Sequence, residues 1–170
     1  MVDICAILRA SDGLIGAGGR TLLTKILRGS RSSDVLSRGL DQNPAYGIYQ
    51  GLAEEEVLGR IDWTILHGYL RIVYDGWLPV LAYTPVGWNI ECETYADEII
   101  RRFDTLLTSS QRPYAMSFLK DKNRELILHV LEKIQMSGDR KYLPVLEDWG
   151  PVAYKAVRQK IGAVMRCLAE

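Results

Sequence analysis

The chain has 170 residues with 21 basic and 21 acidic side chains, and 48% of its residues are hydrophobic. This length suits one domain, or one domain with a small accessory, and can bury a sizeable core without disulfide or metal staples. The composition excludes a disordered chain, and the zero net charge excludes a uniformly basic or uniformly acidic protein.

The first part of the chain is predicted to hold two helices and a short helical turn. Apolar residues at helical spacing predict a helix over residues 2–10, which a glycine-rich loop follows. Leucines and isoleucines at the same spacing predict a second helix that begins at Arg20 and ends at Gly29. Ser32 or Ser33 is then placed to cap a short third turn.

The middle of the chain is predicted to hold a helix followed by a β-hairpin. After a long loop, apolar spacing and three glutamates at the start predict a helix over residues 54–67. Two runs of β-branched and aromatic residues, 69–74 and 78–84, flank Asp75-Gly76, a dipeptide that favours a tight hairpin turn. Three helical elements and then a hairpin is the order of a winged helix.

The last part of the chain is predicted to be helical. Thr94, with an acid three residues later, is predicted to begin a helix with Ile99 and Phe103 facing inward. Polar residues and a proline then indicate a boundary between two charge regimes. Three further helices are predicted over residues 122–136, 139–149 and 151–168. The predicted fold is mainly α-helical with a small β-hairpin, and its predicted parts are a winged helix over 1–107, a linker over 108–118 and a helical extension over 119–170.

Cysteine and histidine usage gives no sign of a metal site or a disulfide framework. Cys5, Cys92 and Cys167 lie far apart, and neither His67 nor His129 neighbours a cysteine. We therefore expect inert thiols in a reducing compartment, no metal and no cofactor. Since the chain begins with no charged-then-apolar leader and has no 18-residue apolar span, we expect a cytoplasmic protein.

The glycine cluster does not match a nucleotide-binding loop. Leu14 stands where a phosphate loop has its first glycine, Arg20 replaces its lysine, and a helix rather than a strand precedes the cluster. Thr21 occupies the third glycine position of a dinucleotide fingerprint that would begin at Gly16 and Gly18. A flexible turn is the favoured interpretation. Because the glutamate run and the histidines also assemble no catalytic constellation, we expect no enzyme activity.

The zero net charge is the sum of three unequal parts. Residues 1–53 carry a net charge of +2, residues 54–104 carry −6, and residues 105–170 carry +4. Within the first part, residues 20–38 hold five basic side chains and one acidic one. This segment is therefore the predicted contact for a polyanion.

The basic segment offers several kinds of phosphate ligand. On its helix, Arg20, Thr24 and Arg28 are predicted to share one face, with Thr21 and Lys25 beside it. The polar stretch Gly29-Ser30-Arg31-Ser32 follows directly. Guanidinium groups, hydroxyls and backbone N–H groups all suit phosphate oxygens. The alternative interpretation is a solvated helix face with a polar cap.

Trp77 lies at or next to the predicted hairpin turn. An exposed indole is unfavourable unless it covers something. One hypothesis is a wedge that stacks on a base at a duplex end, and the other is a tryptophan that folds back over its own hairpin.

Five segments of the sequence resemble the RQC domain of RecQ-family helicases. They are residues 19–32, 46–48 (Tyr-Gly-Ile), 65–70, 78–81 and 84–88. The resemblance covers about residues 1–105 and implies a winged helix that binds duplex and forked DNA. It also implies that the segment ending in Arg28-Gly29-Ser30-Arg31-Ser32 touches the DNA backbone, and that the hairpin separates strands with Trp77 as its tip.

Three departures from the family limit what the resemblance implies. The 170 residues contain no ATPase motor and no cysteine-rich zinc module, so we do not expect intrinsic unwinding. The predicted hairpin is short, and its tip aligns less clearly with the family than the basic segment does. The acidic run of residues 54–56 opens the helix that a winged helix lays in the major groove, which disfavours insertion there. Arg60, Trp63 and His67 of that helix remain secondary candidates.

The leading hypothesis is a non-catalytic protein that contacts the phosphate backbone of duplex or forked DNA with weak sequence preference, in DNA repair, replication or recombination. Its predicted DNA contacts are Arg20, Thr21, Lys25, Arg28, Gly29, Ser30, Arg31, Ser32, Arg60, Trp63 and Trp77. One alternative is an interaction module that docks onto a helicase or nuclease through the winged helix or the helical tail. The proposed tail surface has apolar Tyr142, Leu143, Leu146 and Trp149 with basic Lys155, Arg158 and Lys160. A second alternative is a transcriptional regulator, which the acidic helix start disfavours.

Overall fold

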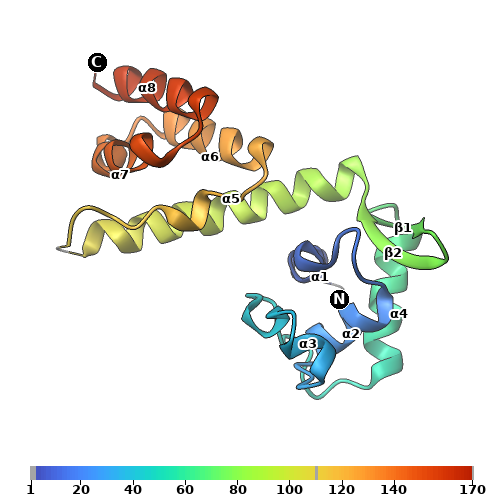
Figure 1. Cartoon of the computed structure of the whole chain (residues 1–170). Coiled ribbons are helices and arrows are strands. Elements are labelled where there is room, and N and C mark those ends of the chain that lie inside the picture. The colour runs from blue at the N-terminus through green and yellow to red at the C-terminus, as the bar shows by residue number, and fades with distance from the viewer. Residues whose placement is uncertain (1–2, 110, 170) are drawn as a thin grey trace. The chain divides into compact units, whose positions relative to one another are not determined.

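A computed structural model of the chain describes residues 3–109 and 111–169 (Figure 1). Residues 1, 2, 110 and 170 lie outside the described residues, and with them the start of the predicted first helix, one residue of the predicted linker and the last residue of the predicted extension. The chain divides into two compact units, Met1–Glu91 and Cys92–Glu170. This division falls inside one long helix, α5 (Pro85–Thr108), which contributes residues to both units. The predicted fold class, mainly α-helical with a small hairpin, is confirmed.

Short amphipathic helices form most of the N-terminal unit. They are α1 (Ile4–Ser11), α2 (Arg20–Leu27), α3 (Ser33–Leu36) and α4 (Glu54–Leu66), with 3-10 turns η1 (Asp12–Leu14) and η2 (Leu40–Gln42). Their apolar stripes meet in one core, in which Leu8, Leu23 and Ile61 are fully buried. Local periodicity therefore predicted these helices to within a few residues, because each buries one face against the others.

The predicted hairpin is present and its turn is tight. Strand β1 (Leu70–Asp75) pairs antiparallel with β2 (Leu78–Tyr83), and Asp75 stands opposite Leu78. Gly76 and Trp77 therefore form a two-residue turn, and Gly76 has φ of 58°, which glycine adopts without steric cost. Figure 1 shows the hairpin at the edge of the N-terminal unit, with its turn pointing away from α1, α2 and α3.

The glycine cluster before α2 is part of the hairpin's packing. Gly16 N donates to the Leu81 carbonyl and Leu81 N donates to the Gly18 carbonyl, each at 2.9 Å. A Cβ added to Gly19 would lie 2.9 Å from the carbonyl oxygen of Pro79. The predicted flexible turn is thus wrong in one respect, since the segment is fixed to β2 by backbone hydrogen bonds and needs glycine for this close approach.

Helix α5 begins nine residues earlier than predicted, at Pro85 instead of Thr94. The Thr84 hydroxyl accepts a hydrogen bond from Gly87 N at 3.0 Å and donates to the Gly68 carbonyl at 2.6 Å. Proline at the first helical position loses no hydrogen bond, because that N–H has no partner inside a helix. The pair Thr84-Pro85 is therefore the start signal, and Thr94 is an interior helix position.

The C-terminal unit combines the second part of α5 with three further helices, which pack together in Figure 1. They are α6 (Arg124–Ser137), α7 (Leu143–Trp149) and α8 (Lys155–Ala169), with 3-10 turns η3 (Ser117–Leu119), η4 (Arg140–Tyr142) and η5 (Gly150–Val152). Tyr142, Leu146 and Trp149, predicted as an apolar docking surface, are at most 5% exposed and form part of the core. The hypothesis of that surface is therefore wrong.

None of the helices in the described ranges is long and apolar enough to cross a bilayer.

An ion-pair network ties α5 to α6 in this unit. Glu93 of α5 binds His129 Nε2 at 2.6 Å and also Lys133, which pairs with Asp97 at 2.6 Å. Lys133 and His129 hold the pKa of Glu93 below its ordinary value. His129 is thus a half-buried structural residue.

Candidate nucleic-acid interface

The hairpin turn carries the most exposed aromatic side chain of the N-terminal unit among the described residues. Trp77 is 97% exposed, next to Tyr74 at 73% and Leu78 at 68%. Of the two hypotheses for Trp77, the one in which it folds back over its hairpin is therefore wrong. A large apolar tip that is this exposed is typical of a surface that meets a partner.

The predicted basic face of α2 is turned toward α4. Thr24 is only 2% exposed and its hydroxyl donates to the Arg20 carbonyl, so the face that it shares with Arg20 and Arg28 is partly covered. Arg20 binds Asp62 of α4, and Arg28 donates to the carboxylate of Glu54 at 3.1 Å. The two arginines thus bind carboxylates of the acidic helix.

The remaining cations of this region are also engaged in part. Lys25 binds Asp34 at 3.0 Å, and this contact lowers the pKa of Asp34. Thr21 is exposed at the first turn of α2, and Arg31 is exposed and forms no ion pair with any described residue. Arg31 is therefore the side chain of the predicted basic segment that is most available to a phosphate.

The loop after α2 is shaped by a close approach of two backbones. Gly29 has φ of 71°, and a Cβ there would lie 3.1 Å from Gly47 Cα. Gly47 N donates to the Ile26 carbonyl at 2.9 Å, and the Tyr46 hydroxyl donates to the Ser30 carbonyl at 3.1 Å. Two of the segments that carry the sequence resemblance, 19–32 and 46–48, are thereby held together.

The serines of this loop have different surroundings. The Ser30 hydroxyl accepts from Ser32 N at 3.3 Å. Ser32 occupies the N-cap position of α3, but its side chain makes no capping bond, and its Oγ is buried with no hydrogen-bond partner among the described residues. The predicted capping role of the Ser32 side chain is therefore wrong.

The secondary candidates on α4 are occupied by their own neighbours. Arg60 binds Glu56 at 2.7 Å and lies 4.7 Å from the centroid of the Tyr49 ring; these contacts raise the pKa of the guanidinium. Trp63 is half-buried and stacks on His67, with ring centroids 3.8 Å apart. These contacts leave Arg60 and Trp63 little freedom to reach a ligand.

The comparison with known families agrees with this geometry. The family model of the RQC domain matches residues 2–105, more than half of the chain. The chain belongs to the RQC domain family. RQC domains are non-catalytic winged-helix modules that bind DNA in RecQ helicases. A search of curated proteins and a search of solved structures each returned no match.

The charge balance of the N-terminal RQC unit is close to neutral. Residues 1–91 contain eight basic and ten acidic side chains, so this unit carries a net charge of −2. The acids of α4 lie beside the bases of α2, which reduces the positive potential that the sequence count of residues 20–38 suggested. The RQC unit therefore offers a few separate cations to a polyanion and no broad basic face.

Three exposed residues of the hairpin are absent from the sequence prediction of the candidate interface. Tyr74 and Leu78 flank Trp77 at the tip, and Arg71 on β1 is exposed and unpaired within the described part of the chain. Their positions follow from the alternation of side chains between the two faces of β1 and from the pairing of Asp75 with Leu78 at the turn. The two-residue turn was predictable, but which hairpin face is covered depends on the rest of the unit.

Within residues 3–109 and 111–169, no group of three His, Cys, Asp or Glu side chains is arranged to hold a metal ion.

Proposed function

We propose that the RQC unit of this protein binds DNA at a duplex end or fork. In this proposal Trp77 stacks on the terminal base pair while the backbone is held by phosphate contacts. The observation that supports it best is the 97% exposure of Trp77 at the two-residue turn of the hairpin. The chain belongs to a family of domains that bind DNA.

Stacking is a sufficient source of preference for an end over continuous duplex. Stacking of a base on an aromatic side chain contributes about 1–3 kcal/mol. At about 1.4 kcal/mol for each factor of ten, this corresponds to roughly 5- to 150-fold in affinity. Because a blunt end and a fork both expose a terminal pair, covalently closed duplex is the reference that lacks the stacking site.

The phosphate contacts are few in this proposal. Arg31 after α2 and Arg71 on β1 have no ion pair among the residues described, whereas Arg20, Lys25 and Arg28 must leave carboxylates to bind DNA. With two phosphate contacts at about −0.9 each, log K falls with log salt at a slope of roughly −2. Sequence preference is weak, because phosphate contacts carry no base information.

The acidic start of α4 supports a binding mode in which this helix stays out of the major groove. Glu54 and Glu56 bind Arg28 and Arg60, and Glu55 is exposed. Insertion of α4 would bring these carboxylates toward phosphates, which repel them. The hairpin and the loop after α2 therefore make the contacts.

The test is fluorescence anisotropy of labelled forked DNA, blunt duplex, closed dumbbell duplex and single-stranded DNA at several salt concentrations. Trp77→Ala is expected to weaken binding to fork and blunt duplex by about fivefold or more, and to leave binding to the dumbbell nearly unchanged. Tyr154→Ala, which removes a 65% exposed aromatic side chain of the C-terminal unit, is the matched control and leaves all four affinities unchanged. An equal loss on the dumbbell would overturn the stacking role, and undetectable binding to every DNA would overturn the proposal.

A further inference from the structure

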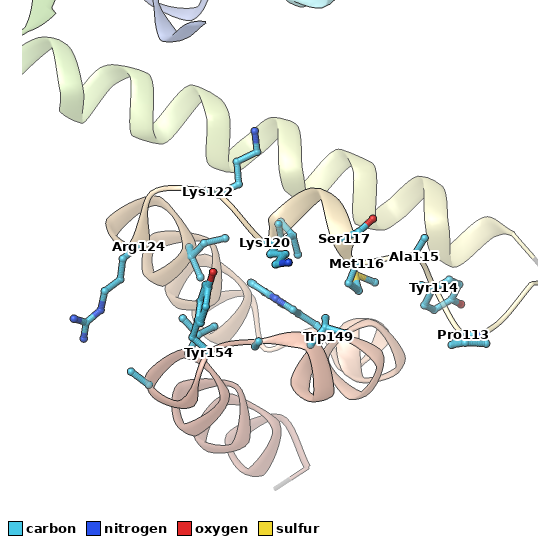
Figure 2. A pocket seen from close by; sticks show the side chains of 16 residues that line it. Pro113, Tyr114, Ala115, Met116, Ser117, Lys120, Lys122, Arg124, Trp149 and Tyr154 are labelled. Atoms are coloured by element: carbon cyan, nitrogen blue, oxygen red, sulfur yellow. The ribbon is translucent and has the colours of Figure 1, made fainter. Parts of the chain in front are cut away.

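The C-terminal unit contains a groove that the DNA-binding proposal does not use. Its volume is about 880 Å³, within the range of ligand-binding clefts. It lies among η3, the start of α6, the end of α7 and the start of α8. Figure 2 shows an elongated hollow, with Arg124 and Tyr154 near one end and Pro113 and Tyr114 near the other.

The wall formed by Pro113 and Tyr114 is fixed to α7 by contacts of Tyr114 and of the preceding residue, Arg112. Arg112 donates to both Asp148 oxygens, at 3.2 and 3.0 Å, and to Glu147 at 3.1 Å. Tyr114 N also donates to Asp148 at 2.9 Å. Since bidentate arginine–carboxylate contacts hold a fixed geometry, this side of the groove is formed before any ligand arrives.

The floor of the groove is apolar and buried, whereas part of its edge is exposed to water. Met116, Leu119 and Ile127 line it and are buried, together with Trp149, which is only 2% exposed. In contrast, Val152 and Tyr154 are 61% and 65% exposed at its edge. Because these two side chains line the same groove as the apolar floor, together they form a continuous apolar surface, which is typical of a site that a partner covers.

The charged residues that line the groove all carry the same sign. They are Lys120, Lys122 and Arg124, and none of the lining residues within the described ranges is acidic. Lys122 lies 5.0 Å from the centroid of the Tyr95 ring, whereas Lys120 and Arg124 are exposed and form no ion pair in the described ranges. In Figure 2, Lys120 is turned toward the hollow between Trp149 and Tyr154, and the guanidinium of Arg124 extends beyond its edge.

We propose that this groove binds a short peptide segment of a partner protein, in which apolar or aromatic anchors are flanked by acidic residues. The anchors fill the buried apolar floor beside Trp149, and the acidic residues reach Lys120, which is turned toward the hollow, and Arg124 at its edge. An elongated apolar groove with one-sided charge fits an amphipathic peptide, which is recognised by a few anchor side chains and steered by charge. A nucleic-acid strand is disfavoured, because it needs cations along its whole path, and here the end near Pro113 and Tyr114 is lined by apolar and aromatic side chains.

The proposal is tested with peptides selected for binding to the full chain. A random phage-displayed library of peptides about 12 residues long is panned on the immobilised protein, and enriched peptides are made with a fluorescent label. We expect the enriched sequences to combine net negative charge with two or more apolar anchors. Failure to enrich any sequence, or enrichment of basic or wholly polar sequences, overturns the proposal.

Matched variants then place the bound peptide. Lys120→Glu with Arg124→Glu is expected to weaken the selected peptide by about tenfold or more, and Tyr154→Ala by about fivefold. The control, Arg101→Glu with Arg166→Glu, makes the same charge change at exposed positions outside the groove and is expected to change affinity less than about twofold. Equal losses in both charge variants overturn the site. Far-UV circular dichroism and thermal unfolding of each variant separate loss of binding from loss of fold.

Two further measurements distinguish other occupants of the groove. Competition of the peptide by single-stranded DNA that is lost in the Lys120→Glu, Arg124→Glu variant would make the groove a nucleic-acid site and overturn the proposal. A concentration-dependent dimer in sedimentation that the peptide dissociates would make the occupant a second copy of this chain and overturn the proposal. The Trp77→Ala variant keeps full peptide affinity, so this proposal and the DNA-binding proposal succeed or fail separately.

Discussion

Two glycine-to-alanine substitutions in helices of the N-terminal unit are expected to change stability in opposite directions. In α5, a Cβ on Gly87 would lie 2.8 Å from the Tyr69 carbonyl carbon and 3.3 Å from its Cα, and still closer to its oxygen. In α4, a Cβ on Gly59 would meet nothing within 4 Å. The chemical change is identical, so the difference between the two variants reports the approach of α5 to the start of β1.

The magnitude follows from the type of obstacle. Overpacking costs about 1–3 kcal/mol, and we expect the upper end at Gly87, because the Tyr69 backbone cannot rotate away as a side chain can. The higher helix propensity of alanine offsets at most about 1 kcal/mol of this cost, so the free energy of unfolding is expected to fall by roughly 2 kcal/mol. Gly59→Ala has only the propensity gain, about 0.5–1 kcal/mol.

The assays are thermal unfolding and urea unfolding of the full chain, both followed by far-UV circular dichroism and tryptophan fluorescence. At about 4–8 °C per kcal/mol for a unit of this size, Gly87→Ala is expected to lower Tm by roughly 8–16 °C and Gly59→Ala to raise it by a few degrees. A Gly87→Ala variant as stable as the wild type would refute the close approach. Equal destabilisation by both substitutions would show that the loss does not arise at Tyr69.

Three other predictions concern capping, electrostatics and salt. Thr84→Ala removes the hydroxyl that bonds Gly87 N and the Gly68 carbonyl, and is expected to cost about 1–2 kcal/mol in the same urea assay; an unchanged midpoint would mean that Thr84 does not cap α5. Because Lys133 and His129 lower the pKa of Glu93 in the folded state, their stabilising effect is present above the ordinary value of 4.5 and is lost as the pH falls through the lowered folded value. Glu93→Gln is therefore expected to be less stable than the wild type at pH 6 and equal to it at strongly acidic pH, and a difference that persists in acid would contradict this assignment. Arg31→Ala is expected to make the slope of log K against log salt for forked DNA less steep by about 1, from about −2. A wild-type slope of −3 to −4 would instead show that the arginines paired with carboxylates also engage DNA.

Elements whose signals are local in sequence were predictable. The spacing of Leu22, Leu23, Ile26 and Leu27 follows the helix period, and Asp75-Gly76 favours a tight turn whatever surrounds it. The fold class, the hairpin and most helices follow from such patterns. The start of α5 is also marked locally, by threonine before proline, whereas the capping pattern at Thr94 predicts a start nine residues later.

The features that decide the candidate interface are not local. Arg20 and Asp62 are 42 positions apart, and Arg28 and Glu54 are 26 apart, so a count of charges along the chain cannot show that they pair. In the same way, the exposure of Trp77 depends on what the rest of the unit leaves uncovered. The groove of the C-terminal unit was missed because Trp149 looked like a surface residue by sequence and is a floor residue in the fold.

The continuity of α5 has a consequence for dissecting this chain. The family match ends at residue 105, yet Phe103 is fully buried in the C-terminal unit, with its ring centroid 5.8 Å from Trp149. Ile99 and Tyr95, on the same helix, are also buried. A fragment that ends at the end of the family match would expose the aromatic and aliphatic side chains of this helical segment to water. Aggregation of such a fragment could not be distinguished from instability of the RQC fold. A fragment that ends at residue 91 lacks this apolar segment, and its unfolding would therefore report the stability of the N-terminal unit alone.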